Sequence, residues 1–343
     1  AVNEGYFEEL IRKYLLENPH GCIMTLIPKK GLAAQREKEL EEKLEAYRSS
    51  LSEEQLDAMV EKTKALEAYQ EAGEDPKALE CIPMLKRSDI KKEAAKIVNE
   101  ELTVDNSLFL YHDVCTNGIG YVDLMFKTDS IAPEQIPYLG LLKSVLDYVD
   151  TENYTYGELF NEINANTGGI NCGVEVFDRA DSTEEFQAMF SVRGKALYTK
   201  MDFLFKMIGE ILNSSKLEDT KRLYEIVASV KSRAQVNLTG AGHSTAVLRA
   251  AAYSSPMAAF QDEMAGIGYY QFIEKLEKDF EQRKEETVEE LCKLMKKILR
   301  PENFMISYTG ERESLETVQK LAGAVKAGLG TEPVEKSKED RKS

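Results

Sequence analysis

Histidine and cysteine side chains are the first residues to examine for chemistry, because they are the usual ligands of transition metals. The sequence holds three histidines, His20, His112 and His243, and five cysteines. A zinc site needs several imidazole or thiolate ligands at workable spacing. The nearest pair is His112 and Cys115, and its position in a predicted turn favours packing over metal binding. Neither HExxH nor the inverse HxxEH occurs. We therefore predict no metal ligands in this chain.

Nucleophile and phosphate-binding motifs are also missing. The sequence contains neither GxxxxGK nor GxSxG. The stretch Gly240-Ala-Gly-His-Ser244 resembles half of a glycine-rich motif, but it follows a predicted helix and so indicates a bend between helices. His243 and Ser244 are sequence neighbours and make a poor catalytic dyad. Arg249 and Tyr253 lie four apart on a predicted helix, where a contact would be structural rather than catalytic. We predict no catalytic residue here and assign no substrate-binding residue.

Composition limits the partners and the compartment. The chain has 343 residues, enough for about two domains. Sixty acidic residues oppose 44 basic ones, giving a net charge of −16, which argues against nucleic acid or an anionic membrane as a partner. No apolar run approaches the roughly 20 residues of a membrane span. The five cysteines are widely scattered, their number is odd, and no two of them form a CxxC pair. We therefore expect reduced thiols in a cytoplasmic protein.

Residues 106–177 are the segment around which the rest must pack. The Asn117-Gly118 dipeptide tolerates the positive φ of a tight turn, so the flanking apolar runs predict a β-hairpin. Thr155 and Glu158 have capping-box spacing and mark the start of a helix, which Gly168 could end in the left-handed conformation. The predicted elements are strands at 107–113, 119–128 and 172–177, a helix at 133–149, and a helix after Thr155 with an apolar stripe of Leu159, Phe160 and Ile163.

The N-terminal third has a different character. A helix at 3–17 and a strand at 22–28 are too few to bury themselves, so we expect them to belong to another sheet. Charged helical residues follow at 31–72. The capping box from Ser52 to Gln55 places a turn between two arms and predicts an antiparallel helical hairpin. A surface spacer is the favoured interpretation, because each arm has too few heptads for a dimerising coiled coil.

The remaining segments predict an α+β fold, in which helices pack on one face of a sheet. A strand at 186–192 should pair with 172–177 after a turn at 182–185. Residues 331–343 are charged and poor in apolar residues, so they predict a linker or a disordered end. The other predicted elements are helices at 197–212, 217–238, 246–253, 268–299 and 313–328, and a strand at 303–309.

Several stretches together resemble one known family. They are YFEELIRKYLLENPHGCIMTLIP, ALEAYQEAGEDPKALECIPMLKRSDI, TGGINCGVEVF, GAGHSTAVLRAAA and EMAGIGYYQFIEKL. The chain resembles an internal region of the presequence-protease branch of the pitrilysin/insulinase zinc peptidases. Those proteins have four sandwich domains, joined as two halves by a helical hairpin around a peptide-degrading chamber. The resemblance implies that residues 1–30 end a preceding peptidase domain, 31–95 form the hairpin linker, and 96–330 form a third domain of the mitochondrial-processing-peptidase type.

The resemblance also implies that this third domain is degenerate. The family's first domain carries its ligands in an I-P-H-x-x-E-H run, and the similar segment here is Ile136-Pro-Tyr138-Leu-Gly-Leu141-Leu142. A phenol and two isobutyl groups cannot hold Zn²⁺ or activate its water. The family's fourth domain uses an Arg and a Tyr on the scissile carbonyl. That stretch is absent here, so the role is not transferred to Arg249 and Tyr253.

The resemblance implies a non-catalytic part of a zinc metalloendopeptidase that degrades short or unfolded peptides in a closed chamber. Zn²⁺ is implied for the full-length enzyme and no cofactor for this fragment, which we expect to be inactive alone. The expected partners are the remaining domains of the same polypeptide and peptide substrates. The alternative is a stand-alone protein-binding or scaffold module that uses the helical hairpin as a partner-binding arm.

Overall fold

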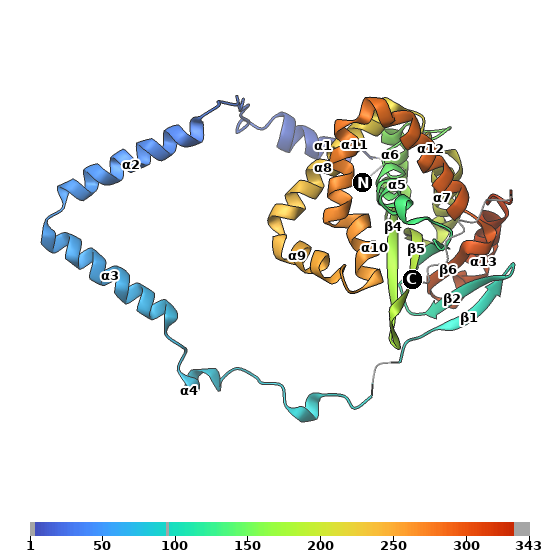
Figure 1. Ribbon diagram of the computed structural model, residues 1–343, viewed down its shortest axis with the longest axis horizontal. Coiled ribbons are helices and arrows are strands. Elements are labelled where there is room, and N and C mark those ends of the chain that lie inside the picture. Colours follow the sequence, from blue (N-terminus) through green and yellow to red (C-terminus); the bar gives the residue numbers. More distant parts are fainter. Residues whose placement is uncertain (1–3, 94–95, 333–343) are drawn as a thin grey trace. The chain divides into compact units, whose positions relative to one another are not determined.

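The structure is a computed structural model that describes residues 4–93 and 96–332 (Figure 1). Contacts along the chain divide it into two units, residues 1–94 and residues 95–343. We describe each unit by itself.

The first unit consists of helices joined by extended segments. The capping box predicted at Ser52 is confirmed: Gln55 donates its backbone N–H to Ser52 Oγ at 3.3 Å, and Gln55 Oε1 accepts from Ser52 N at 2.9 Å. A helix in the opening segment is also confirmed, although its second half is a π-helix. The elements are α1 (Tyr6–Ile11), η2 (Arg12–Leu16), α2 (Leu32–Ser50), α3 (Glu53–Glu71), α4 (Pro76–Leu79) and η3 (Arg87–Asp89).

The strand predicted at 22–28, which was expected to pair with strands outside this chain, does not form in the described structure. These residues form no regular element, because a strand exists only by pairing and residues 4–93 offer no partner strand. None of residues 4–93 is buried. The apolar stripes of α2 and α3 remain open, with Leu44 56% and Leu66 55% exposed. The tight turn between two helical arms is therefore present, but the arms do not bury their stripes on each other.

The second unit is built on a six-stranded sheet in the order β1-β2-β6-β3-β5-β4. The pairings are antiparallel except that of β2 with β6, which is parallel. The predicted pairing of 172–177 with 186–192 is confirmed, since Cys172 lies opposite Val192 and Val176 opposite Ala188. The strands are β1 (Glu100–Val104), β2 (Ser107–Asp113), β3 (Ile119–Lys127), β4 (Ile170–Arg179), β5 (Ser182–Leu197) and β6 (Phe304–Gly310).

The predicted hairpin between β2 and β3 is wrong, although its turn is present. Asn117 (φ 53°) and Gly118 (φ 81°) adopt the expected positive φ. The final strand β6 is inserted between β2 and β3, so the connection spans two strand spacings, roughly 10 Å. The hairpin at this edge joins β1 to β2 through Asp105 (φ 48°) and Asn106 (φ 64°). The polar composition of β1 hid that strand from sequence analysis.

Helices cover one face of this sheet. Along β6, Phe304, Ile306 and Tyr308 are buried, and the residues between them are only partly buried. This alternation places the core between the sheet and its helices and leaves the other face more open. The helices of this unit are η4 (Pro133–Gln135), α5 (Ile136–Val145), α6 (Tyr156–Asn166), η5 (Tyr198–Lys200), α7 (Met201–Ser214), α8 (Thr220–Gly240), α9 (Gly242–Ala251), α10 (Pro256–Ala265), α11 (Ile267–Lys278), α12 (Phe280–Ile298), η6 (Pro301–Asn303), η7 (Arg312–Ser314) and α13 (Leu315–Ala327).

Several local predictions need correction. The single helix expected at 268–299 is broken at Asp279 into α11 and α12. Phe160 was expected on the apolar stripe of α6 but is 63% exposed, whereas Leu159 is buried. Gly169 (φ 108°), not Gly168, takes the positive φ after that helix. The turn expected at 182–185 lies at residues 180–181, because β5 begins earlier than predicted. The tail prediction falls mostly on 333–343, outside the described residues.

Candidate functional site

Helix α5 carries the segment that the resemblance aligned with a metal-binding helix. Pro137 occupies the first turn, where a missing N–H costs nothing, and Leu139, Leu142 and Val145 are buried against the core. Gly140 allows close packing on α10, because a Cβ there would overlap the carbonyl oxygen of Met264. Sequence and packing thus hold α5 in the centre of the domain.

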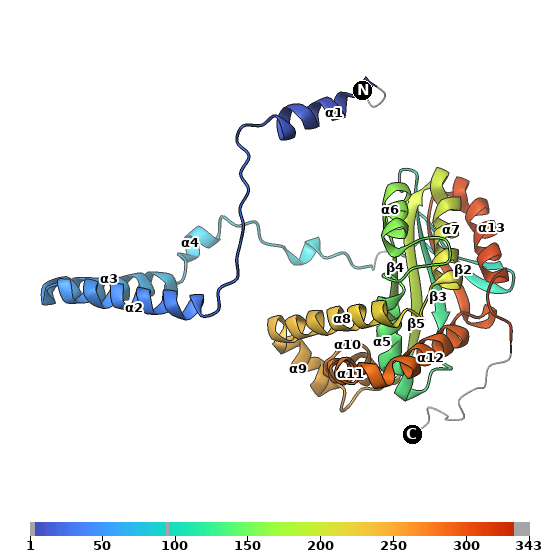
Figure 2. The same ribbon diagram turned by 90° about the horizontal axis from the view of Figure 1, so that it is seen from above.

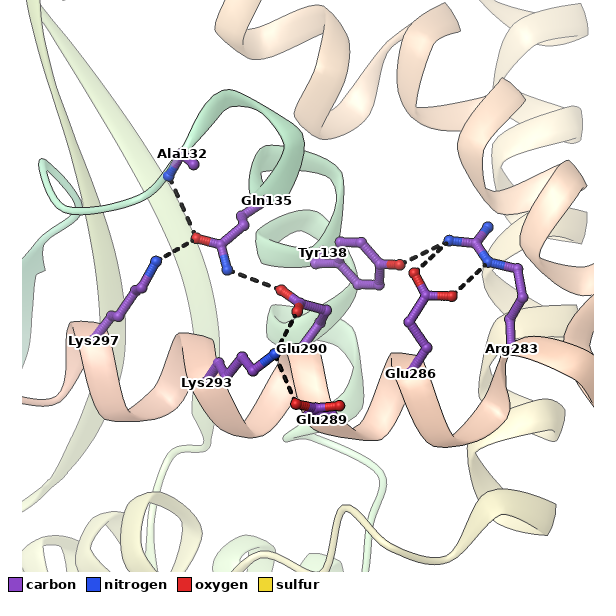
Figure 3. A network of polar contacts seen from close by, with 9 residues as sticks. All are labelled: Ala132, Gln135, Tyr138, Arg283, Glu286, Glu289, Glu290, Lys293 and Lys297. Atoms are coloured by element: carbon purple, nitrogen blue, oxygen red, sulfur yellow. Dashed lines mark hydrogen bonds and ion pairs between the residues drawn. The ribbon is translucent and has the colours of Figure 1, made fainter. Parts of the chain in front are cut away.

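The hydroxyl of Tyr138 points toward Arg283 of α12 (Figure 3). Its hydroxyl accepts a hydrogen bond of 2.9 Å from Arg283 Nη2, and its ring meets Phe272 edge to face with centroids 4.8 Å apart. Arg283 also pairs with Glu286 at 3.2 Å. Burial raises the pKa of Tyr138, and the Arg283 charge opposes that shift. The phenol is therefore a neutral hydrogen-bonding anchor.

The three residues aligned with the zinc ligands and general base do not fit a metal. Leu141 and Leu142 are 0% and 1% exposed and belong to the hydrophobic core. Zinc requires nitrogen, sulfur or carboxylate donors, and the hydroxyl of Tyr138 is already bonded to a cation. In the part of the chain that the structure describes, no group of three or more His, Cys, Asp or Glu side chains could hold a metal ion.

A polar network joins the start of α5 to α12, next to Tyr138 (Figure 3). Gln135 donates to Glu290 Oε2 at 2.9 Å and accepts from Lys297 Nζ at 2.8 Å. Lys293 pairs with Glu289 at 2.8 Å and with Glu290 at 3.0 Å. Burial raises the pKa of Glu290, but the hydrogen bonds from Gln135 and Lys293 outweigh it, and the net shift is downward. These contacts fix the start of α5 against α12.

The other singled-out side chains are not brought together. His112 lies on β2, where its Nε2 is 3.1 Å from Ser307 Oγ, and no bond joins it to Cys115 within the described chain. His20 lies in the first unit and His243 at the start of α9. The expectation that His112 serves packing agrees with these contacts.

Arg249 has a structural partner. Its Nη1 is 2.5 Å from Oδ2 of Asp262, whose side chain is 1% exposed. Asp262 also accepts the backbone N–H groups of Ile267 and Gly268 and so caps α11. Tyr253 is 84% exposed. Arg249 therefore compensates a buried carboxylate.

No helix among residues 4–93 and 96–332 is long and apolar enough to cross a membrane.

The more open face of the sheet holds a polar hollow that sequence analysis missed. Arg193 pairs with Asp123 at 2.8 Å and with Glu175 at 3.0 Å, across three neighbouring strands. Asp123 and Arg193 line a cavity of about 450 Å³, together with Tyr121 and Lys195. Burial raises the pKa of Asp123, and Arg193 opposes the shift. The cross-strand position of Asp123 and Arg193 was the available signal, but it required the register of β3 and β5.

With the geometry described, comparison with known proteins assigns the family. Residues 26–276 match the family described as peptidase M-16C associated. The chain belongs to this family. The resemblance to a non-catalytic region of pitrilysin-family peptidases is thereby confirmed.

The chain is similar to parts of longer proteins. It is 35% identical over 316 residues to Protein HypA of Clostridium perfringens, covering 92% of this chain and 32% of that protein. It is 28% identical over 318 residues to presequence protease 1, chloroplastic/mitochondrial, of Arabidopsis thaliana, covering 93% of this chain and 29% of that protein. The presequence protease, mitochondrial, of Saccharomyces cerevisiae is 28% identical over 317 residues, with 90% and 31% covered. The chain thus spans about a third of the length of these relatives.

Proposed function

We propose that this chain is a non-catalytic section of a larger zinc metalloendopeptidase that degrades short or unfolded peptides in a closed chamber. The observation that carries the proposal is the match to the peptidase-associated family over residues 26–276, in a chain about a third as long as its presequence-protease relatives. In this proposal the second unit forms part of the chamber wall, and residues 31–95 act as the hinge.

The packing of α5 supports a wall role for the second unit. Tyr138, Leu141 and Leu142, which the resemblance aligned with a metal site, carry a phenol and two hydrocarbon side chains, and Arg283 binds the phenol. Such a domain can enclose a substrate and restrict water without taking part in hydrolysis. Zn²⁺ would then be held by another domain of the same polypeptide.

The exposure of the first unit supports its assignment to a larger assembly. Ile23, Leu26 and Ile27 are 100%, 86% and 82% exposed in an apolar segment that pairs with nothing in the described unit. Burying such side chains is worth about 1.5–3 kcal/mol each. The remaining domains of the polypeptide are the partners that we propose for this segment.

The experiment is to express the complete reading frame and measure its metal content and its cleavage of unfolded peptides. The proposal expects an HxxEH sequence outside these 343 residues, one zinc per polypeptide and chelator-sensitive cleavage. A folded protein too large for a chamber should resist cleavage and become a substrate once it is unfolded. A complete protein that lacks a metal-binding motif and peptidase activity would rule the proposal out.

The second candidate is a stand-alone binding or scaffold module. The long, exposed arms α2 and α3 favour it, because an arm that buries nothing is available to a partner. A reading frame that encodes only this chain would favour the module, and one that encodes an additional metal-binding domain would exclude it.

We also propose a cytoplasmic location, supported by five free cysteines, which cell fractionation would test.

A further inference from the structure

A second, smaller cavity lies among the helices of the second unit, away from the strands that bear Asp123 and Arg193. It has a volume of about 250 Å³ and is lined by residues of α5, α8, α9, α10 and α11 and by Gly266 between α10 and α11. α8 packs on α11, and α10 lies beside both α9 and α11 (Figure 2). The cavity is therefore part of the packed helical layer, and no role assigned above uses it.

One polar side chain that lines this cavity lacks a hydrogen-bond partner within the described residues. Tyr269 is 6% exposed and lines the cavity, and its hydroxyl forms no hydrogen bond within the described residues. A buried hydroxyl without a partner is costly, and native structures rarely leave one unsatisfied. Burial raises the pKa of Tyr269, so at neutral pH the hydroxyl keeps its proton and can donate it in a hydrogen bond.

One positive charge lies close to this hydroxyl. Arg233 lines the cavity, and its charge acts on Tyr269 and on Asp147. Its guanidinium lies 5.8 Å from the centroid of the Tyr148 ring and makes no ion pair with a carboxylate of the described chain. Among the described lining residues none is an aspartate or glutamate. The nearby carboxylate of Asp262 is already paired with Arg249, so Arg233 is the cation left among the described lining residues to meet a ligand in this cavity.

The rest of the lining combines hydrogen-bonding and apolar groups. Asn237 and Ser144 add polar side chains, while Val230 and Leu238 supply hydrocarbon. The guanidinium N–H groups of Arg233 and the hydroxyl of Tyr269 can donate hydrogen bonds to the two oxygens of a carboxylate. The cavity volume of about 250 Å³ is several times the roughly 30 Å³ that a water molecule takes, so it has room for a carboxylate and a small hydrocarbon group.

We propose that this cavity binds a carboxylate carried on a small apolar group, with Arg233 and Tyr269 as the binding residues. The carboxylate belongs either to a free short-chain acid or to the C-terminus of a peptide. In both cases the guanidinium and the hydroxyl hold the two oxygens, and Val230 and Leu238 contact the hydrocarbon. The proposal concerns a binding site separate from the chamber-wall role and holds whether or not that role is correct.

The test is calorimetric titration of the 343-residue chain at fixed ionic strength. The probes are butyrate for a free acid, N-acetyl-leucine for a peptide C-terminus, N-acetyl-leucine amide as the uncharged match, and inorganic phosphate as a different oxyanion. The variants are Tyr269→Phe and Arg233→Gln. Lys221→Gln, on the exposed first turn of α8, is the control for loss of one positive charge.

We expect at least one carboxylate to bind saturably, and the amide to bind at least about tenfold more weakly. Tyr269→Phe and Arg233→Gln should each weaken carboxylate binding at least about tenfold, as expected for loss of a hydrogen bond to a charged group. Without ligand, Tyr269→Phe should melt at the same temperature as the unaltered chain or higher, because it removes an unsatisfied hydroxyl. Tighter binding of N-acetyl-leucine than of butyrate would identify a peptide C-terminus, and the reverse a free acid.

Three results would overturn the proposal. The first is no saturable binding of either carboxylate, which would leave water as the partner of Tyr269. The second is an equal loss of affinity in Lys221→Gln, which would show non-specific charge attraction. The third is tighter binding of phosphate than of both carboxylates.

Discussion

Replacing Tyr138 and measuring the free energy of unfolding tests whether this residue stabilises the packing of α5. Its side chain is 6% exposed, contacts Phe272 through its ring, and receives a hydrogen bond from Arg283. Tyr138→Phe removes the hydroxyl alone, and Tyr138→Ala removes the ring as well. If α5 is a packing element, both substitutions lower the free energy of unfolding, and the second does so far more.

The expected magnitudes follow from these contacts. A hydrogen bond to a charged group is worth about 1.5–3 kcal/mol. Arg283 keeps Glu286 as a partner and is 23% exposed, so water replaces part of the loss and Tyr138→Phe should cost about 1 kcal/mol. Truncating a buried aromatic ring to alanine costs about 3–5 kcal/mol, and Tyr138→Ala should therefore cost about 4 kcal/mol in total.

Urea unfolding followed by circular dichroism measures both values. The chain has no tryptophan, and circular dichroism does not depend on the tyrosines being replaced. The matched control is Tyr253→Ala, a tyrosine of the same unit that is 84% exposed and should cost less than about 0.5 kcal/mol. A cost below about 1 kcal/mol for Tyr138→Ala, or one equal to that of Tyr253→Ala, would refute the packing role.

Three further predictions concern the same unit. Burial raises the pKa of Asp147 to about 6, so the folded chain binds this proton more tightly than the unfolded chain, and stability falls as pH rises from about 4 through 6. Asp147→Asn should make the free energy of unfolding, measured by urea titration, less dependent on pH across that range, and should raise it by up to about 3 kcal/mol at pH 7. An unchanged dependence on pH would contradict the raised pKa of Asp147. Gly140→Ala should cost at least about 2 kcal/mol, because the new methyl overlaps the carbonyl oxygen of Met264, and an unchanged melting temperature would contradict the close packing of α5 on α10. Leu159→Ala should lower the free energy of unfolding by about 2–5 kcal/mol and Phe160→Ala by less than about 0.5 kcal/mol; the opposite order in thermal melts would contradict the burial of Leu159 and the exposure of Phe160.

Local signals in the sequence predicted the elements better than their pairing. Thr155 and Glu158 form the expected capping box, with Glu158 N donating to Thr155 Oγ1 at 3.3 Å. Asn117 and Gly118 adopt the expected turn. Each signal depends on neighbours within a few residues. The insertion of β6 between β2 and β3 depends on residues nearly 200 positions away, and no turn motif encodes such a contact.

The site was predictable only in part, for the same reason. The resemblance aligned Tyr138, Leu141 and Leu142 with the metal ligands and general base of the family, and that alignment needed the sequence alone. The partner of Tyr138 could not, because Arg283 follows it by 145 residues on a different helix. The exposure of Phe160 was likewise hidden, since the stripe of a helix shows which face is apolar but not how much of that face is covered.

Metal analysis combined with a peptidase assay on the purified 343-residue chain tests the proposed non-catalytic role most directly. After dialysis against zinc at neutral pH, we expect no stoichiometric metal on the chain and no cleavage of unfolded peptides. One tightly bound zinc per chain, or cleavage that a chelator abolishes, would contradict the proposed role.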